Sequence, residues 1–90
     1  MPKTADDGVP RDKAAGRLLR ELRENQGLSP EQMPHAMLAK KLTPVSGPTI
    51  RRVEDIGAIP QVRHRFALAQ FFDRQVTDIW RGKARRRVVA

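Results

Sequence analysis

The sequence predicts an all-α fold of five helices in a single domain. Ninety residues are enough for one small domain and too few for two. Apolar residues recur at spacings of three and four, as they do on one face of a helix, and no stretch shows the alternation of a strand. Serine, proline and glycine stand where helices are expected to begin and end.

The first expected helix follows an N-terminal arm, 1–12, which we expect to be disordered because proline and glycine interrupt it and no apolar period is visible. Asp12 is placed to cap this helix, and Gly27 is placed to end it in a left-handed conformation. The expected apolar face consists of Ala15, Leu18, Leu19 and Leu22.

A second helix is expected to begin at Ser29 as the N-cap, with Pro30 at its first position and Gln32 completing a capping box. Its buried stripe would consist of Met33, Met37, Leu38 and Leu42. Pro34 conflicts with a regular helix here, because proline in a helix interior costs about 3 kcal/mol. Either the first turn is irregular or the regular helix begins near Pro34.

A tight turn is expected before the third helix, 46–54, which Ser46 would cap and Gly57 and Pro60 would end. Gly47 and Pro48 would occupy its first turn, and Ile50 and Val53 would face inward.

The fourth expected helix, 62–72, would face the core through Val62, Phe66, Ala69 and Phe72. A last short turn capped by Thr77 would carry Ile79 and Trp80 onto the core. The predicted domain is therefore 13–80, followed by a flexible basic tail, 81–90.

The net charge of +8 is unevenly distributed along the chain. Residues 1–39 are neutral in sum, whereas residues 40–90 carry twelve basic and four acidic side chains. Such an excess is typical of proteins that bind polyanions. Ribosome-associated and membrane-surface proteins share it, and it also suits a solvated surface, so charge alone leaves these classes open.

Several functions lack the residues they need. There is no cysteine, and the two histidines have no suitably spaced partners, so we expect no metal site and no cofactor. No catalytic arrangement and no phosphate-cradling glycine loop is present. No apolar run reaches the length of a membrane span, and the acidic N-terminus is unlike a signal peptide. We expect a cytoplasmic protein that is not an enzyme.

One ordered pattern extends over most of the chain. It consists of Leu19-Arg20-Glu21-Leu22-Arg23, Gly27-Leu28-Ser29, Val45-Ser46, Thr49-Ile50, Arg52-Val53-Glu54, Pro60, and Leu68-Ala69 with Phe72. This pattern resembles the Xre family, the helix-turn-helix DNA-binding proteins of the Cro and lambda-repressor type. The segment between Gly27 and Ile50 is about six residues longer than is usual in the family, so either the second helix or the turn after it is expected to be extended. This extended form resembles regulators of actinobacteria and their phages. Pro34 also departs from the family, which usually has a small residue there.

The resemblance implies a lambda-repressor-like fold in which helix 46–54 enters the major groove of DNA. The usual base-contacting positions fall on Gly47 and Pro48, which lack side-chain donors. Base contacts are therefore expected from Thr49, Arg51 and Arg52, with Pro48 against a thymine methyl. Arg52 is the first choice because it matches a family base contact.

The remaining contacts are expected from other parts of the chain. Candidates for phosphate contacts are Ser29, Lys40, Lys41, Ser46, Gln61, Arg63, His64 and Arg65. Arg81, Lys83, Arg85, Arg86 and Arg87 of the tail could follow the backbone or enter the minor groove. The resemblance assigns Arg23 and Glu54 instead to a partly buried structural ion pair.

The function expected from the sequence is therefore a sequence-specific regulator of transcription that binds double-stranded DNA, as a repressor or Cro-like protein of a bacterium or phage. It would be found with the nucleoid of a bacterial or phage-infected cell. Two alternatives remain: an antitoxin-type autoregulator that also binds a protein, and a non-specific nucleoid binder. Binding as a homodimer and as a monomer are both open.

Overall fold

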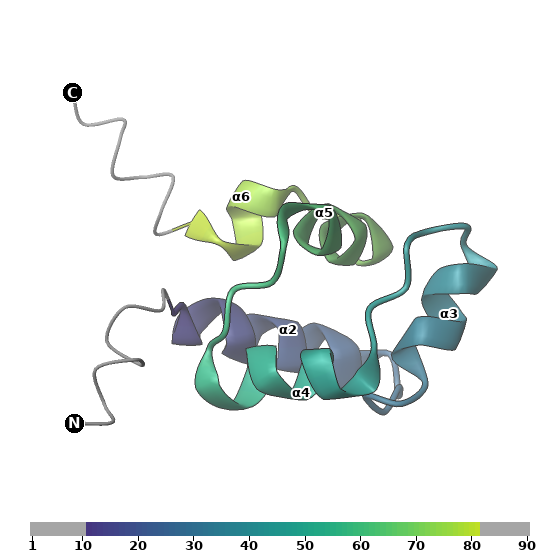
Figure 1. The fold of residues 1–90 in the computed structure, drawn as a ribbon, viewed down its shortest axis with the longest axis horizontal. Coiled ribbons are helices and arrows are strands. Elements are labelled where there is room, and N and C mark those ends of the chain that lie inside the picture. Colours follow the sequence, from purple (N-terminus) through teal and green to yellow (C-terminus); the bar gives the residue numbers. More distant parts are fainter. Residues whose placement is uncertain (1–10, 82–90) are drawn as a thin grey trace.

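The computed structural model describes residues 11–81, and this part of the chain contains five helices and no strand. They are α2 (Lys13–Asn25), α3 (Met33–Ala39), α4 (Gly47–Ile56), α5 (Val62–Phe71) and α6 (Val76–Ile79) (Figure 1). The all-α class expected from the sequence is confirmed.

Helix α2 begins and ends at the predicted residues. The side chain of Asp12 accepts a hydrogen bond from the Ala15 N–H at 3.0 Å, and Gly27 has a φ of 71°. The prediction that the arm 1–12 is disordered is wrong for its last two residues. Arg11 forms an isolated antiparallel bridge with Ala58, and the Asp12 N–H donates to the Gly57 carbonyl at 2.7 Å. Residues 1–10 lie outside the described residues.

Helix α3 begins at Met33, next to Pro34 as the conflict at that proline predicts, and not directly after Ser29. Ser29 and Gln32 do form the reciprocal bonds of a capping box, with the Ser29 N–H donating to Gln32 Oε1 at 2.8 Å and the Gln32 N–H donating to Ser29 Oγ at 3.3 Å. These bonds close an irregular turn in front of the helix. Pro34 therefore falls in the first turn of α3, where its missing N–H costs no helical hydrogen bond.

The connection between the second and third helices is extended, as the length of the segment between Gly27 and Ile50 predicts, and the expectation of a tight turn there is wrong. Residues 40–46 connect α3 to α4, whereas such turns usually have three or four residues. The extra length lies in this connection, since α3 itself has only seven residues. Lys41 adopts a left-handed φ of 62°, and the side chain of Val45 is fully buried, so the connection is attached to the core.

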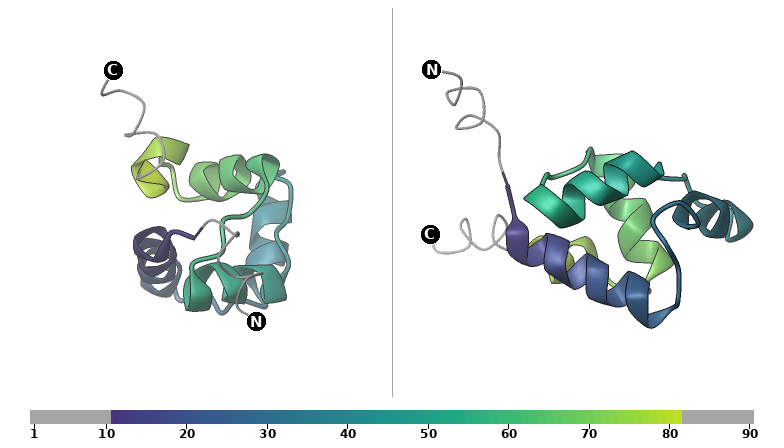
Figure 2. Two further views of the ribbon diagram at one scale, coloured as in Figure 1. Left: turned by 60° about the vertical axis from the view of Figure 1, so that its left-hand side comes forward. Right: turned by 90° about the horizontal axis from the view of Figure 1, so that it is seen from below.

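Helices α2 and α4 lie side by side, while α5 and α6 pack across them and α3 lies at one end (Figures 1 and 2). Gly16 is the residue that lets α2 and α4 approach. A Cβ atom added to it would lie 2.3 Å from the carbonyl oxygen of Val53, well inside the contact limit. This close approach brings the buried faces of the two helices, including Leu19 and Ile50, into one core.

The core draws on all five helices and on the connection before α4. Its members are Ala15, Leu19, Met33, Met37, Val45, Ile50, Val53, Ala67, Leu68, Ala69, Phe71, Phe72, Ile79 and Trp80. The ring of Phe71 meets that of Phe72 edge to face, with centroids 4.9 Å apart.

Three residues predicted to be buried are exposed: Leu38 by 55%, Val62 by 56% and Phe66 by 59%. Of the four residues predicted to face the core from the fourth expected helix, Ala69 and Phe72 are buried, whereas Val62 and Phe66 are not, because the inward side of α5 is centred on Leu68 and Phe71. The cap of α6 also differs from the prediction. Gln75, not Thr77, is the N-cap, and its N–H donates to Asp78 Oδ2 at 3.0 Å.

We predict that Gly16→Ala destabilises the fold although alanine is the better helix former. Intrinsic propensity alone would stabilise the helix by about 1 kcal/mol. The clash with Val53 should instead lower the free energy of unfolding by about 1–3 kcal/mol. Urea unfolding followed by circular dichroism measures the change. Arg17→Ala, on the exposed side of α2, is the control and should change it by less than about 0.5 kcal/mol. A stabilised Gly16→Ala chain would contradict the close approach.

Candidate nucleic-acid interface

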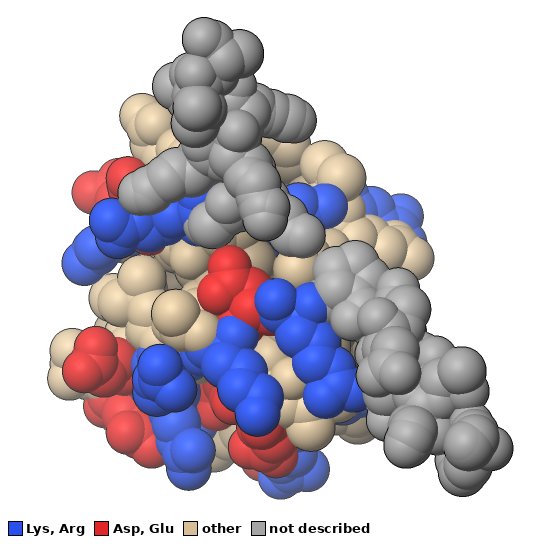
Figure 3. All heavy atoms as spheres, turned by 90° about the vertical axis from the view of Figure 1, so that its left-hand side faces the viewer, with Lys and Arg blue, Asp and Glu red and all other residues tan. Residues whose placement is uncertain are grey.

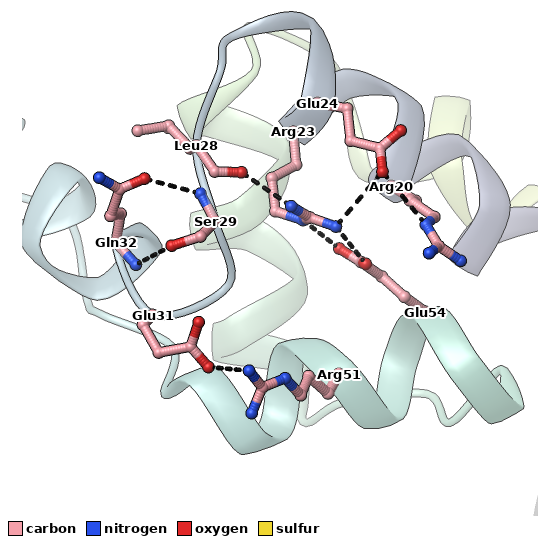
Figure 4. A network of polar contacts seen from close by, with 9 residues as sticks. All are labelled: Arg20, Arg23, Glu24, Leu28, Ser29, Glu31, Gln32, Arg51 and Glu54. Carbon is pink, nitrogen blue, oxygen red and sulfur yellow. Dashed lines mark hydrogen bonds and ion pairs between the residues drawn. The ribbon is translucent and has the colours of Figure 1, made fainter.

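A buried ion pair joins α2 to α4 (Figure 4). Arg23 Nε lies 2.7 Å from Glu54 Oε2, and Arg23 Nη2 lies 2.8 Å from Glu54 Oε1. Only 9% of the arginine side chain and 4% of the glutamate side chain are exposed. The remaining guanidinium nitrogen, Nη1, donates to the Leu28 carbonyl at 2.7 Å.

Two nitrogens of Arg23 bind the two carboxylate oxygens of Glu54, so this bidentate pair fixes the relative orientation of the two side chains as well as their distance. The hydrogen bond with Glu54 raises the pKa of Arg23 above its ordinary value, so the guanidinium stays charged. Both charges are removed from water, and either alone would be costly to bury. Arg23 and Glu54 thus have the structural role that the resemblance implies, and α4 is held in one rotation about its axis.

The first turn of α4 is held by Ser46. Its Oγ accepts a hydrogen bond from the Thr49 N–H at 3.4 Å and donates to Thr49 Oγ1 at 3.0 Å. Gly47 is buried against the 29–32 turn, and Pro48 is exposed. The side chains at the N-terminal tip of α4 are therefore the exposed Pro48 and the hydrogen-bonded hydroxyl groups of Ser46 and Thr49.

Thr49 and Arg52 lie three residues apart on one side of α4 and line a groove between α4 and the start of α5. His64 of α5 and Gln61, the N-cap residue before α5, line the same groove, which we call the α4–α5 groove. No acidic side chain lines it, and Arg52 forms no ion pair with another described residue. The structure thus brings two candidate base contacts together with two candidate phosphate contacts.

The side chain of Arg51 points away from the α4–α5 groove. Its guanidinium forms an ion pair with Glu31, from the turn that precedes α3, and it does not line the α4–α5 groove (Figure 4). Both side chains are more than half exposed, so the pair is a weak one. Arg51 and Arg52 are neighbours in sequence, but the structure separates them.

The other candidate phosphate contacts are dispersed. Lys40 places its ammonium 4.7 Å from the centre of the Phe71 ring, in a cation–π contact. The Nε of Arg65 donates to the Pro60 carbonyl at 3.0 Å, and Ser29 closes the turn before α3. Lys41 and Arg63 line a second groove, away from Arg52. Arg81 is exposed, while Lys83, Arg85, Arg86 and Arg87 lie outside the described residues.

The described residues carry a smaller excess of charge than the whole chain. Between residues 11 and 81 there are thirteen Lys and Arg and eight Asp and Glu. On the face at the left of Figure 1, basic and acidic side chains lie next to one another (Figure 3). A positive field at the α4–α5 groove therefore depends on its local residues and not on one uniformly basic surface.

Two features of the site were not predicted from the sequence. Gly16 sets the spacing of α2 and α4, and a glycine inside an otherwise regular helix could have indicated a close contact. Glu31 pairs with Arg51, and no local pattern joins residues from these two segments.

Comparisons with protein-family models, curated proteins and solved structures give no match to this chain. No helix among the described residues has the length and apolar character required to cross a membrane. Within residues 11–81, no group of three or more His, Cys, Asp or Glu is placed to hold a metal ion.

We predict that Ser46→Ala lowers the free energy of unfolding by about 1 kcal/mol, because it removes the cap of α4. Ser46→Asp should restore most of the loss, since aspartate also caps. Thr43→Ala, at an exposed position in the preceding connection, is the control and should change stability little. Equal stability of the Ser46→Ala, Thr43→Ala and unaltered chains in urea unfolding would contradict this role of Ser46.

Proposed function

We propose that this chain is a sequence-specific DNA-binding regulator of the Xre type. In this proposal α3 and α4 form a helix-turn-helix with an extended connection, and α4 enters the major groove. The observation that carries it is the α4–α5 groove, where Thr49 and Arg52 lie beside Gln61 and His64 with no acidic side chain. None of the side chains that line the groove would repel an anionic ligand.

Arg52 is the proposed base-contacting residue. Its side chain is exposed and has no acidic partner among the described residues, so its guanidinium can donate two parallel hydrogen bonds to guanine O6 and N7. Pro48 and the Thr49 methyl would provide apolar contact to a neighbouring thymine methyl. Arg51 has a lesser part, because Glu31 already binds it.

The start of α5 is the proposed phosphate contact. No side chain caps this helix, so the positive end of its dipole and its first N–H groups are available to an anion. Gln61 and His64 would add side-chain donors at the same place. Such contacts fix the position of α4 on the duplex but do not distinguish sequences.

The test begins with selection of bound duplexes from a random pool, which yields a cognate site. Arg52→Ala should then lose affinity for this site far more than for random duplexes. A bidentate arginine–guanine contact is worth about 1–3 kcal/mol, which corresponds to a loss of roughly 5- to 150-fold. Fluorescence anisotropy at fixed salt measures both affinities.

Two variants serve as controls in the same assay. Gln61→Ala should weaken binding to cognate and random duplexes by the same factor, as expected of a phosphate contact. Arg20→Ala, on the exposed side of α2, should change neither. Equal losses for Arg52→Ala on both duplexes would remove Arg52 as a base contact. The absence of any enriched motif, with similar affinity for all duplexes, would contradict sequence-specific binding altogether.

A further inference from the structure

The outward side of α5 carries an apolar surface that the described part of the chain leaves uncovered. Phe66 is 59% exposed, and Val62, one turn earlier on the same side, is 56% exposed. Single exposed apolar residues are common, but an aromatic ring beside a second large apolar side chain and next to grooves is typical of interaction sites.

Two shallow grooves meet at Phe66. One extends toward the α3–α4 connection and includes Leu42, Lys41 and Arg63. The other extends toward α6 and includes Val76 and Arg74. We call this surface, from Lys41 across Phe66 to Arg74, the Phe66 face.

The Phe66 face has one sign of charge. Lys41, Arg63 and Arg74 line its grooves, and no aspartate or glutamate lines either of them. The three cations are exposed, and none forms an ion pair with another described residue. The face therefore combines an apolar centre with a basic rim.

This face is separate from the α4–α5 groove. His64 lines that groove and precedes Phe66 by two residues, which places the two side chains on nearly opposite sides of α5. A ligand on the Phe66 face would leave Arg52 and His64 accessible. Binding at the Phe66 face is therefore independent of the proposed DNA binding.

We propose that the Phe66 face binds an acidic amphipathic segment of a partner protein. An apolar side chain of that segment would lie against Phe66 and Val62, and its carboxylates would meet Lys41, Arg63 and Arg74. Charge complementarity selects this occupant. A second copy would set the same three cations against one another, and residues 82–90 carry four more basic side chains and no acidic one.

The test uses a labelled synthetic helical peptide with leucine on one face and glutamate on the other. Fluorescence anisotropy with the full chain should give saturable binding, and the same peptide with lysine in place of glutamate should bind at least about tenfold more weakly. Phe66→Ala and Arg63→Glu should each weaken binding of the glutamate peptide by about tenfold or more. Ile56→Ala, at an exposed apolar position on α4, is the matched control and should leave it unchanged.

Three results would overturn the proposal. The first is equal binding of the glutamate and lysine peptides. The second is unchanged affinity in a folded Phe66→Ala chain. The third is self-association in sedimentation that Phe66→Ala abolishes, which would make a second copy the occupant. Duplex binding by Phe66→Ala, measured separately, should equal that of the unaltered chain, so failure of this proposal and failure of the DNA proposal are distinguishable.

Discussion

The arrangement of this fold depends on the buried ion pair between Arg23 and Glu54. A carboxylate that is 4% exposed is tolerated only with a partner that neutralises it and uses its hydrogen-bonding capacity, and Arg23 does both. The third nitrogen of the same guanidinium donates a hydrogen bond to the Leu28 carbonyl, at the start of the segment that leads into α3. One side chain thus relates α2, the segment before α3 and the end of α4. Gly16 complements it by allowing the two helices to approach closely.

The features predicted correctly from the sequence are mostly local ones. Asp12 and Ser46 cap helices, and Gly57 ends one in a left-handed conformation. These roles depend on neighbours within five residues along the chain, so residue type and spacing are sufficient to predict them. The inward side of α5 was not predictable in this way. Phe66 satisfies a helical period as well as Leu68 does, and only packing against the other helices determines which of them is buried.

In the candidate site, too, the local features are predictable from the sequence and the features set by tertiary packing are not. The sequence places both Arg51 and Arg52 on the third helix, and only the family resemblance favours Arg52. The physical distinction between them comes from Glu31, twenty residues earlier than Arg51, which pairs with Arg51 and not with Arg52. The proximity of Thr49 and Arg52 to Gln61 and His64 likewise depends on how α5 crosses α4. With Arg23 and Glu54 fixing the rotation of α4, its outward side carries Arg52, and this is the side that we propose to meet DNA.

A double-mutant cycle on Arg23 and Glu54, with the free energy of unfolding as the measured quantity, shows whether this ion pair holds α4 against α2. Arg23→Met and Glu54→Leu should each cost about 3–5 kcal/mol, because each leaves a buried charge without its partner. The double variant should cost clearly less than the sum of the two, since it leaves neither charge. If the losses of unfolding free energy are additive, the ion pair does not determine the position of α4. The same conclusion follows if each single variant loses no more stability than a variant that removes one partner of the exposed Arg20–Glu24 pair.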